Sequence, residues 1–359
     1  MKPTKRLSFN IERTKASFID PSGALVEHVI EIRENPLTSR TCRIAYGRSR
    51  EKEAGTETFP DPPPFAADTA SCPFCSPQLT QMTPKLLPEK FMSERMISGE
   101  SVLFPNLFPY GKYSAVSIFD QNHFVEIGNA SAASYANSFR NSIEYIKRIL
   151  KQDPKAIYVA ITQNHLPSAG GSLVHPHLQI NADRLPGNHH RFLKQRCRQY
   201  YKNHQTLLLS DYLDCEMREQ KRFIGTTGDW HWLAAFAPEG FYEIWGIIPG
   251  VASIRRLSNR QIVDFCQGII QTQKFYRSLN RNGYNLGLLS IEREESRLEL
   301  RAVLMVRSNY APWVRNDHTG FEVMLGDMAT FTAPEQTAAL ARPFWNRKNN
   351  KVSSNRSDS

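Results

Sequence analysis

Two stretches of the chain carry apolar residues at helical spacing, and each is followed by strands. Residues 131–152 and 258–279 place large apolar side chains three or four positions apart, which predicts two amphipathic helices. Runs rich in β-branched and aromatic residues follow at 156–162 after the first helix, and at 284–291 and 298–306 after the second. The order helix, strand, strand therefore recurs at an offset of about 125 residues, within the error of predicted boundaries. This recurrence indicates a duplicated architecture.

Further strands are predicted at 231–238 and 242–248, and Ala333-Pro334-Glu335 is typical of the first turn of a last helix. Strands and helices do not alternate regularly, which favours an α+β fold with a mainly antiparallel sheet flanked by helices. Residues 51–71 are acidic and then proline-rich, which predicts a loop or extended arm. We expect two related halves and a mobile polar tail, with bounds at 1–185, 186–346 and 347–359.

The second strand of the first half has polar side chains on one face. His175, His177 and Gln179 are spaced by two, so they share a face of an extended strand. The small residues of 168–171 (Ser-Ala-Gly-Gly) come just before it and allow backbone N–H groups to approach an anion. One histidine on a strand is usually a packed residue, but an imidazole pair beside such a turn favours chemistry at phosphorus.

Composition limits the setting in which this chemistry takes place. The chain has 359 residues, 40% of them hydrophobic, and no apolar run approaches the roughly 20 residues of a membrane span. Its first residues lack the apolar stretch of a secretory signal. We therefore expect a cytoplasmic protein without a membrane partner.

The net charge of +10 requires an anionic partner or a solvated basic surface. Basic residues are dense at 191–202 and in the C-terminal tail, but no helix-turn-helix or RNA-binding aromatic signature is present. Solvated surface charge accounts for most of the excess, and phosphorylated substrates fit it as well as RNA does. We expect no nucleic-acid partner.

Cysteine usage singles out one pair. Six cysteines in a chain of this length do not make a disulfide scaffold, and four of them are scattered. Cys72 and Cys75 form a C-P-F-C pair, which in an intracellular protein indicates metal ligation or redox chemistry. The alternative is a pair of buried thiols, because cysteine is commonly buried.

These motifs together resemble the galactose-1-phosphate uridylyltransferase family of the histidine-triad superfamily. The active-site signature of that family is matched by Asn164, Gly170, Ser172, His175, Pro176, His177 and Gln179. Asn35-Pro36-Leu37-Thr38 is similar to the family's N-terminal motif, and Arg48 stands where the family has a nucleotide-contacting arginine. Asn106, within residues 104–109, resembles the asparagine that lines the uracil and ribose pocket. Residues 320–322 and 334–336 resemble the family's C-terminal segments.

The resemblance implies a two-step transfer by a histidine nucleophile. His177 would attack the α-phosphorus of a nucleoside-diphosphate sugar such as UDP- or ADP-hexose, and a phosphorylated acceptor such as a hexose 1-phosphate would then take the nucleotide. A neutral imidazole is a competent nucleophile near pH 7. The backbone carbonyl of His175 would hold the other ring N–H, and Gln179 would bind the phosphoryl oxygens.

The resemblance also implies a substrate-binding loop. Ser172 and the amides of Gly170 and Gly171 would hold the leaving phosphate, and Asn164 would contact phosphate or orient the loop. The expected partners are a nucleotide sugar and a sugar phosphate. The family precedent for oligomeric state is a homodimer.

Zinc is the cofactor that the resemblance implies. Cys72, Cys75 and His175 match three of the family's ligand positions, whereas a structural zinc site needs four. Aligning residues 123–127 with the family's central strand places Ala132 at the fourth position. His123 is the nearest histidine, but it stands elsewhere in the pattern. A different fourth ligand, a water-completed site and a site without zinc remain open.

Departures from the family pattern leave the reaction itself open. Gly171 stands where the family often has a cysteine, as it does in nucleotide-sugar phosphorylase relatives. Pro249-Gly250-Val251 replaces a basic element of the second half, so that half is expected to be degenerate. A phosphorylase or hydrolase of nucleotide sugars or dinucleoside polyphosphates, and a non-catalytic nucleotide-binding descendant, are the alternatives.

Overall fold

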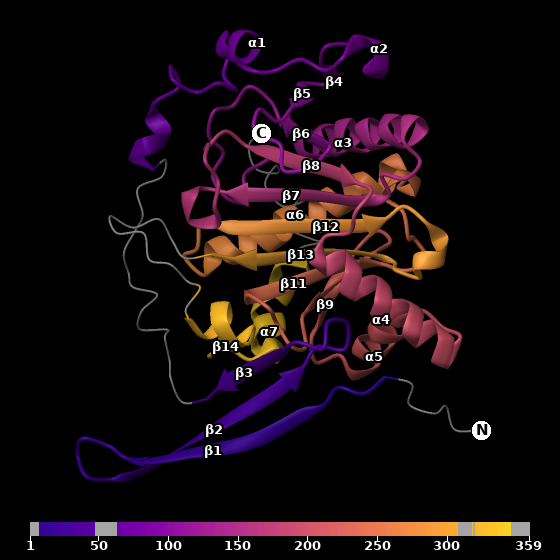
Figure 1. The fold of residues 1–359 in the computed structure, drawn as a ribbon. Coiled ribbons are helices and arrows are strands. Elements are labelled where there is room, and N and C mark those ends of the chain that lie inside the picture. The colour runs from indigo at the N-terminus through magenta and orange to yellow at the C-terminus, as the bar shows by residue number, and fades with distance from the viewer. Residues whose placement is uncertain (1–6, 47–62, 308–317, 319, 346–359) are drawn as a thin grey trace, which may run out of the picture.

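The computed structural model describes residues 7–46, 63–307, 318 and 320–345. Arg48 and the predicted tail lie outside these residues, as does most of the predicted 51–71 loop. A ten-stranded sheet forms the body of the described chain, with α3 and α6 behind it in the view of Figure 1. Its strand order is β4-β5-β6-β8-β7-β12-β13-β11-β10-β9.

The first half of this sheet is built from residues 96–183. Its elements are β4 (Met96–Ser98), β5 (Ser101–Pro105), β6 (Tyr113–Ile118), α3 (Ala132–Gln152), β7 (Tyr158–His165) and β8 (His177–Asp183). The second half repeats this order. Its elements are β9 (Phe223–Thr227), β10 (Trp230–Ala234), β11 (Phe241–Ile248), α6 (Asn259–Ser278), β12 (Tyr284–Ile291) and β13 (Leu300–Val306).

Both halves place three strands, a helix and two further strands in the same order. β7 and β12 meet at the centre of the sheet and pair antiparallel along their whole length, from Tyr284 opposite His165 to Ile291 opposite Tyr158. The predicted α+β class with a mainly antiparallel sheet is confirmed. The division at residue 185 stays a prediction, since hydrogen bonding continues across the sheet without a gap.

The two long helices begin at side-chain caps. Ser131 accepts a hydrogen bond from the Ser134 amide at the start of α3, and Ser258 and Gln261 form a capping box at the start of α6. The apolar stripes of both helices are buried against the sheet and against each other. At Gly268 of α6 a Cβ would lie 1.9 Å from the Trp232 ring, so the indole packs directly on the helix backbone.

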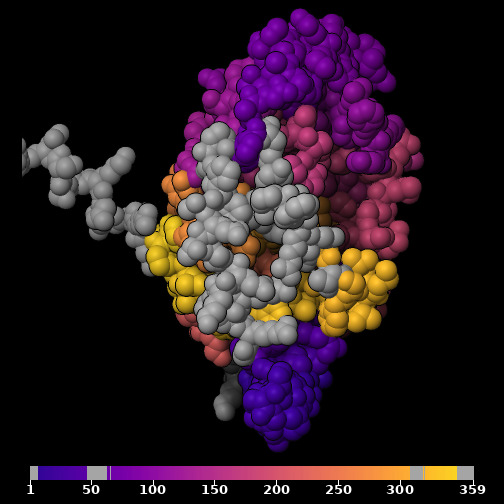
Figure 2. Space-filling model, turned by 90° about the vertical axis from the view of Figure 1, so that its left-hand side faces the viewer, coloured from indigo at the N-terminus to yellow at the C-terminus, as the bar shows by residue number. Residues whose placement is uncertain are grey.

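A smaller sheet joins the two ends of the described chain. It contains β1 (Ile11–Ile19), β2 (Leu25–Glu34), β3 (Thr41–Ala45) and β14 (Met328–Thr330), and β14 pairs parallel with β3. The β1–β2 hairpin projects from the body, as the indigo end in Figures 1 and 2 shows. Buried Arg33 of β2 forms ion pairs with Glu31 and with Glu335 of α7 (Pro334–Trp345). This charge network fixes the small sheet to the second half.

The other helices cover the margins of the large sheet. They are α1 (Gln78–Met82), α2 (Pro88–Phe91), α4 (Asn188–His204) and α5 (Leu208–Glu219). Short single turns lie at η2 (Pro64–Ala67), η3 (Pro167–Ala169), η4 (Ile254–Arg256), η5 (Glu294–Ser296) and η6 (Phe321–Leu325). α4 lies in front of the sheet in Figure 1, on the side away from α6. Within the described residues, no helix has the length and apolar character needed to cross a membrane.

Two local predictions differ from the structure. Residues 123–127, aligned with a strand in the sequence, form an irregular segment before α3, and Ala132 is the first residue of that helix. The strand predicted to include His175 begins only at His177. Pro176 has no N–H to donate to a ladder, so the strand starts after it.

Candidate functional site

The site is organised by two rows of residues on one face of the central sheet. Gln179 of β8 pairs with Thr162 of β7, and Thr162 pairs with Gly287 of β12. The β7–β8 register ends there; continued by two residues, it would bring His177 opposite Asn164, which pairs with Asn285 of β12. A Cβ at Gly287 would meet nothing within 4 Å, so the surface beside these rows is open.

The ring of His177 is oriented by the backbone. Its Nδ1 lies 2.7 Å from the carbonyl oxygen of His175. Because a carbonyl only accepts, Nδ1 carries the proton and the lone pair is on Nε2. Burial lowers the pKa of His177, so the imidazole is neutral at pH 7. Phe74 packs edge-on against this ring, with centroids 5.3 Å apart. A neutral, oriented imidazole of this kind is suited to nucleophilic attack.

The second half contributes a side chain to the site. Asn285 of β12 donates from Nδ2 to Oδ1 of Asn164 at 2.7 Å and to the Ala169 carbonyl at 2.9 Å. Arg307, just after β13, donates to Oδ1 of Asn285 at 2.9 Å. Asn285 therefore connects the strand carrying Asn164 to the turn before the histidines. Sequence reasoning missed this residue.

The turn between β7 and β8 is tightly closed on itself. Gly170 has φ +83°, and its amide donates to the Pro167 carbonyl at 2.9 Å. The Gly171 amide donates to the Leu166 carbonyl at 3.0 Å. Both amides that were expected to hold phosphate are thus engaged within the turn. The exposed side chain of Ser172 stays available to a ligand, and Ser168 has a buried hydroxyl without a hydrogen-bond partner among the described residues.

Leu166, at the start of this turn, has an unusual backbone conformation. Its φ of 71° and ψ of 164° lie in a region that is essentially restricted to glycine. Strain of this kind costs about 1–3 kcal/mol and persists only where the surroundings impose it. The Leu166 side chain is buried, and its carbonyl accepts from the amides of Ala169 and Gly171. The turn is therefore held in one conformation.

Gly171 is the position at which the turn leaves no room for a side chain. A Cβ there would lie 2.9 Å from the Asn164 carbonyl oxygen and 3.0 Å from the Leu166 carbonyl oxygen. We expect Gly171→Ala to destabilise the protein by about 1–3 kcal/mol, because backbone atoms must move to accept the methyl group. Thermal unfolding measures the change, and Gly287→Ala, where a Cβ meets open space, is the control. Equal melting temperatures for the two variants would contradict the expected clash.

Four potential metal ligands, one of them His175, lie close together. Cys72, Cys75, His123 and His175 offer ligand atoms that all lie within 4.8 Å of one another. The Cys75 Sγ is 3.2 Å from Nδ1 of His123 and 3.5 Å from Nδ1 of His175, and the Cys72 Sγ is 3.9 Å from the latter. A tetrahedral zinc with ordinary Zn–S and Zn–N bonds has ligand-to-ligand distances of roughly 3.3–3.8 Å. The donor set therefore fits a metal ion.

Hydrogen bonding supports the same assignment. Nε2 of His175 donates to the Asp120 carbonyl at 2.9 Å, which leaves the lone pair on the Nδ1 that faces the thiols. Burial and the neighbouring Cys72 raise the pKa of Cys75 to about 11. A bound cation would offset that cost and hold the thiolates. His123 enters the cluster from the irregular segment before α3, which the strand alignment had placed elsewhere.

The other residues predicted from the sequence lie away from the two rows that contain His177 and Gln179. Asn106 follows β5, and its Oδ1 accepts from the Phe108 amide at 3.1 Å. The N-P-L-T motif packs on the second half, where Asn35 and Thr38 both donate to Glu239. Among the described residues, neither Asn106 nor Asn35 has a hydrogen bond to His177.

The chain was compared with known protein families, sequences and structures. No protein-family profile matches the chain. An uncharacterized protein of Archaeoglobus fulgidus is 27% identical over 323 residues, covering 90% of this chain and 94% of that protein.

Solved structures show the same fold. An ADP-glucose phosphorylase of Arabidopsis thaliana with bound ADP-glucose has a TM-score of 0.67 at 18% identity, covering 87% of this chain and 98% of that one. A uridylyltransferase structure has a TM-score of 0.63 at 18% identity, covering 89% of this chain and 99% of that one. The chain therefore has the fold of these two enzymes.

Proposed function

We propose that the protein is a nucleotidyltransferase that moves a nucleoside monophosphate from a nucleoside-diphosphate sugar to a phosphorylated acceptor. The observation that carries the proposal is the 2.7 Å contact between Nδ1 of His177 and the His175 carbonyl, which presents the Nε2 lone pair. The likeness to a structure with bound ADP-glucose supports the donor class. A sugar 1-phosphate is the acceptor that the original resemblance implies.

In the first step, Nε2 of His177 attacks the α-phosphorus and forms an N–P bond. The bond from the α-phosphorus to the bridging oxygen breaks, and the sugar 1-phosphate leaves with that oxygen. In the second step, a phosphate oxygen of the acceptor attacks the same phosphorus and the N–P bond returns its electrons to Nε2. Throughout both steps the proton stays on Nδ1, which keeps donating to the His175 carbonyl.

Neighbouring side chains bind the charge that develops on the phosphoryl group. Gln179 lies one row along β8 from His177 and can donate from its amide. Asn164 lies in the row of His177, held by Asn285. Ser172 exposes its hydroxyl at the end of the turn. We assign the substrate phosphates to this group and no step to the amides of Gly170 and Gly171.

We further propose that the four-residue cluster holds a structural zinc ion. Zinc would supply no chemistry to the transfer but would cross-link three segments of the chain at His175. The backbone carbonyl of His175 also accepts the hydrogen bond that orients His177, so the cluster would hold that carbonyl in place. The orphaned Nε2 of His123, buried without a partner among the described residues, lies on the ring that completes the cluster.

Inorganic phosphate as acceptor is the second candidate. Two observations support it: Gly171 stands where the family often has a cysteine, as in nucleotide-sugar phosphorylase relatives, and an ADP-glucose phosphorylase has the same fold with a TM-score of 0.67. The first step would be unchanged. Phosphate would then release a nucleoside diphosphate.

Intact-protein mass spectrometry tests the proposed first step. After exposure to UDP-glucose, ADP-glucose and GDP-glucose, we expect one nucleoside monophosphate to be added per chain, with the base given by the added mass. Acid-labile label is expected for an N–P bond. A protein that gains no mass with any nucleotide sugar, although it binds one, would favour the non-catalytic descendant.

Product analysis then separates the acceptors. The nucleotidyl-protein is mixed with a hexose 1-phosphate, with inorganic phosphate or with water alone. Loss of label only with a hexose 1-phosphate assigns a transferase, and loss with phosphate assigns a phosphorylase. Loss in water at the same rate would assign a hydrolase.

A further inference from the structure

A basic cavity lies at the other end of the sheet from His177. It has a volume of about 360 Å³ and lies between α4, the start of β7, the end of β12 and η5. β7 and β8 are antiparallel, with Tyr158 opposite Asp183, so the cavity is at the Asp183 end of β8. The seven residues of that strand separate it from His177 by roughly 20 Å. The transfer site does not use this cavity.

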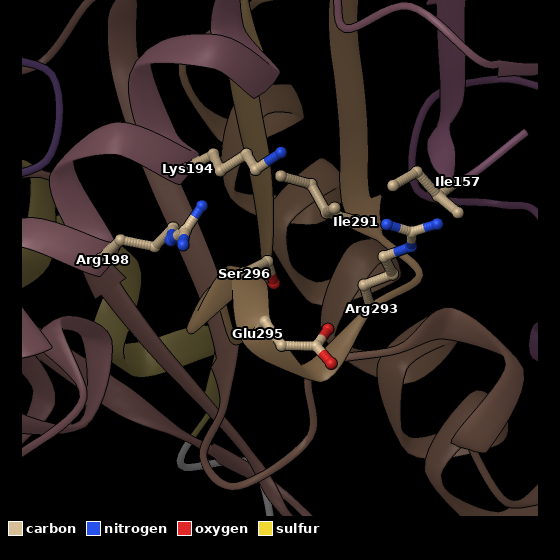
Figure 3. Close-up of a pocket in the computed structure, with 7 residues that line it drawn as sticks. All are labelled: Ile157, Lys194, Arg198, Ile291, Arg293, Glu295 and Ser296. Atoms are coloured by element: carbon tan, nitrogen blue, oxygen red, sulfur yellow. The ribbon is translucent and has the colours of Figure 1, made fainter. Parts of the chain in front are cut away.

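The lining of the cavity carries a net positive charge. Lys194 and Arg198 of α4 face Arg293 across it, and Glu295 is the one acid in its lining (Figure 3). Three cations against one carboxylate leave a net charge of +2. Among the ion pairs of the described residues, none involves Lys194, Arg198 or Arg293. Buried Arg33 and Arg222, by contrast, are each paired with carboxylates.

The helix itself is built without acids. α4 has five Lys or Arg residues in 17 positions and no Asp or Glu, so it has no i,i+4 ion pair of its own. Four of the cations follow one stripe, and they continue from the cavity into a neighbouring concavity of about 490 Å³. That concavity is lined by Arg191, Lys194, Gln195, Arg198, Gln199 and Lys202. Like charges at this spacing repel one another unless an anion lies between them.

Parts of the cavity are already fixed in place. The ammonium of Lys194 donates to the Tyr158 hydroxyl at 3.0 Å and lies over the Tyr158 ring. Ser296 is 2% exposed, and Ile157 and Ile291 form an apolar floor. A concave surface with a held lysine, two arginines and an apolar floor fits a small molecule with several phosphate charges, and its volume is that of a small-molecule site.

We propose that this cavity is a second anion site, which takes a small molecule carrying two or more linked phosphate groups. The proposal does not rest on the transfer reaction at His177. Bidentate contacts from Arg198 and Arg293 and the point charge of Lys194 would bind the phosphate oxygens. The linked phosphates come either from inorganic tripolyphosphate or from a nucleoside triphosphate.

Hydrogen exchange with tripolyphosphate as the probe tests this site locally. We expect tripolyphosphate to slow exchange in peptides covering α4 and η5, with an affinity that falls as salt rises. The double variant Arg198→Glu/Arg293→Glu should weaken binding at these peptides at least tenfold. Lys147→Glu/Lys151→Glu, two exposed charge reversals on α3, is the matched control and should bind as the unaltered protein does.

The same measurement distinguishes a nucleotide from inorganic tripolyphosphate as the ligand, and it can overturn the proposal. Equal protection by ATP and tripolyphosphate means that phosphate alone is recognised, and stronger protection by ATP identifies a nucleotide as the source. Unchanged binding in the double variant would overturn the proposal. Protection of α4 by RNA but by neither phosphate compound would overturn it too. Exchange is measured at α4 and η5, away from His177. A negative result there therefore does not bear on whether the nucleotidyl adduct forms on His177.

Discussion

His177→Ala is expected to abolish transfer, lowering the rate by roughly 10³-fold or more, because no other residue in the row presents a nucleophilic lone pair. The covalent nucleotidyl-protein should be absent from the mass spectrum of the variant. Asn164, Asn285 and Gln179, which share the sheet face with His177, are amides and do not replace an imidazole. The measurement is single-turnover labelling with the donor that labels the unaltered protein.

His231→Ala is the control for removing a histidine elsewhere. His231 lies on β10, and within the described part of the chain its Nδ1 is hydrogen-bonded to the Asp229 carbonyl. That variant should label at the normal rate. Label that survives in His177→Ala would assign the nucleophile to another residue.

The pH dependence follows from the burial of the same ring. Burial lowers the pKa of His177, so its neutral form dominates at and above pH 6.5. Labelling should hold a plateau there and decline only below pH 6.5. Burial also lowers the pKa of His165 to about 4. Between pH 6.5 and about 4 the unfolded chain therefore binds more protons than the folded one, and stability falls as pH falls. Thermal unfolding at each pH separates that loss from loss of the nucleophile.

The spacing of apolar residues along the chain predicted the helices and strands that bury one face in the core. The stripes of α3 and α6, with their strands, could be predicted because apolar side chains repeat at 3.6-residue spacing against the core. The hairpin of β1 and β2 gave no such signal. Every residue of β1 is exposed, so its pairing with β2 has no apolar pattern.

The site residues divide in the same way. His175, His177 and Gln179 could be recognised from their order in one segment. Asn285 lies in the site because β12 pairs with β7 in one register across the two halves, and that register depends on tertiary packing. A polar residue at the open face of an otherwise apolar strand, Tyr-Asn-Leu-Gly-Leu-Leu, was the available signal. His123 reaches the cysteines through an irregular segment, for which no sequence period exists.

His123→Asn is expected to remove a bound metal and to lower the thermal stability of the protein. Structural zinc sites contribute about 10–16 kcal/mol over four ligands, so losing one ligand weakens binding by roughly 10²-fold. Cys75→Ser should have the same effect. Metal content per chain, measured by elemental analysis after dialysis against a weak chelator, and the melting temperature are the readouts. Cys215→Ser, a buried thiol outside the cluster, should keep the metal.

The His123 variant decides between the structure and the alternatives left by the sequence. A site completed by water, or by another ligand, would keep its full metal content in His123→Asn, whereas the four-residue cluster loses it. The consequence for transfer is indirect, since His123 contacts Cys75 and not the nucleophile. Loss of the metal would remove the contact at Nδ1 of His175 and leave the bond of its Nε2 to the Asp120 carbonyl, so the residue whose carbonyl holds the Nδ1 proton of His177 is less firmly fixed. Labelling should therefore slow in this variant without vanishing, and added zinc at high concentration should restore both the label and the melting temperature.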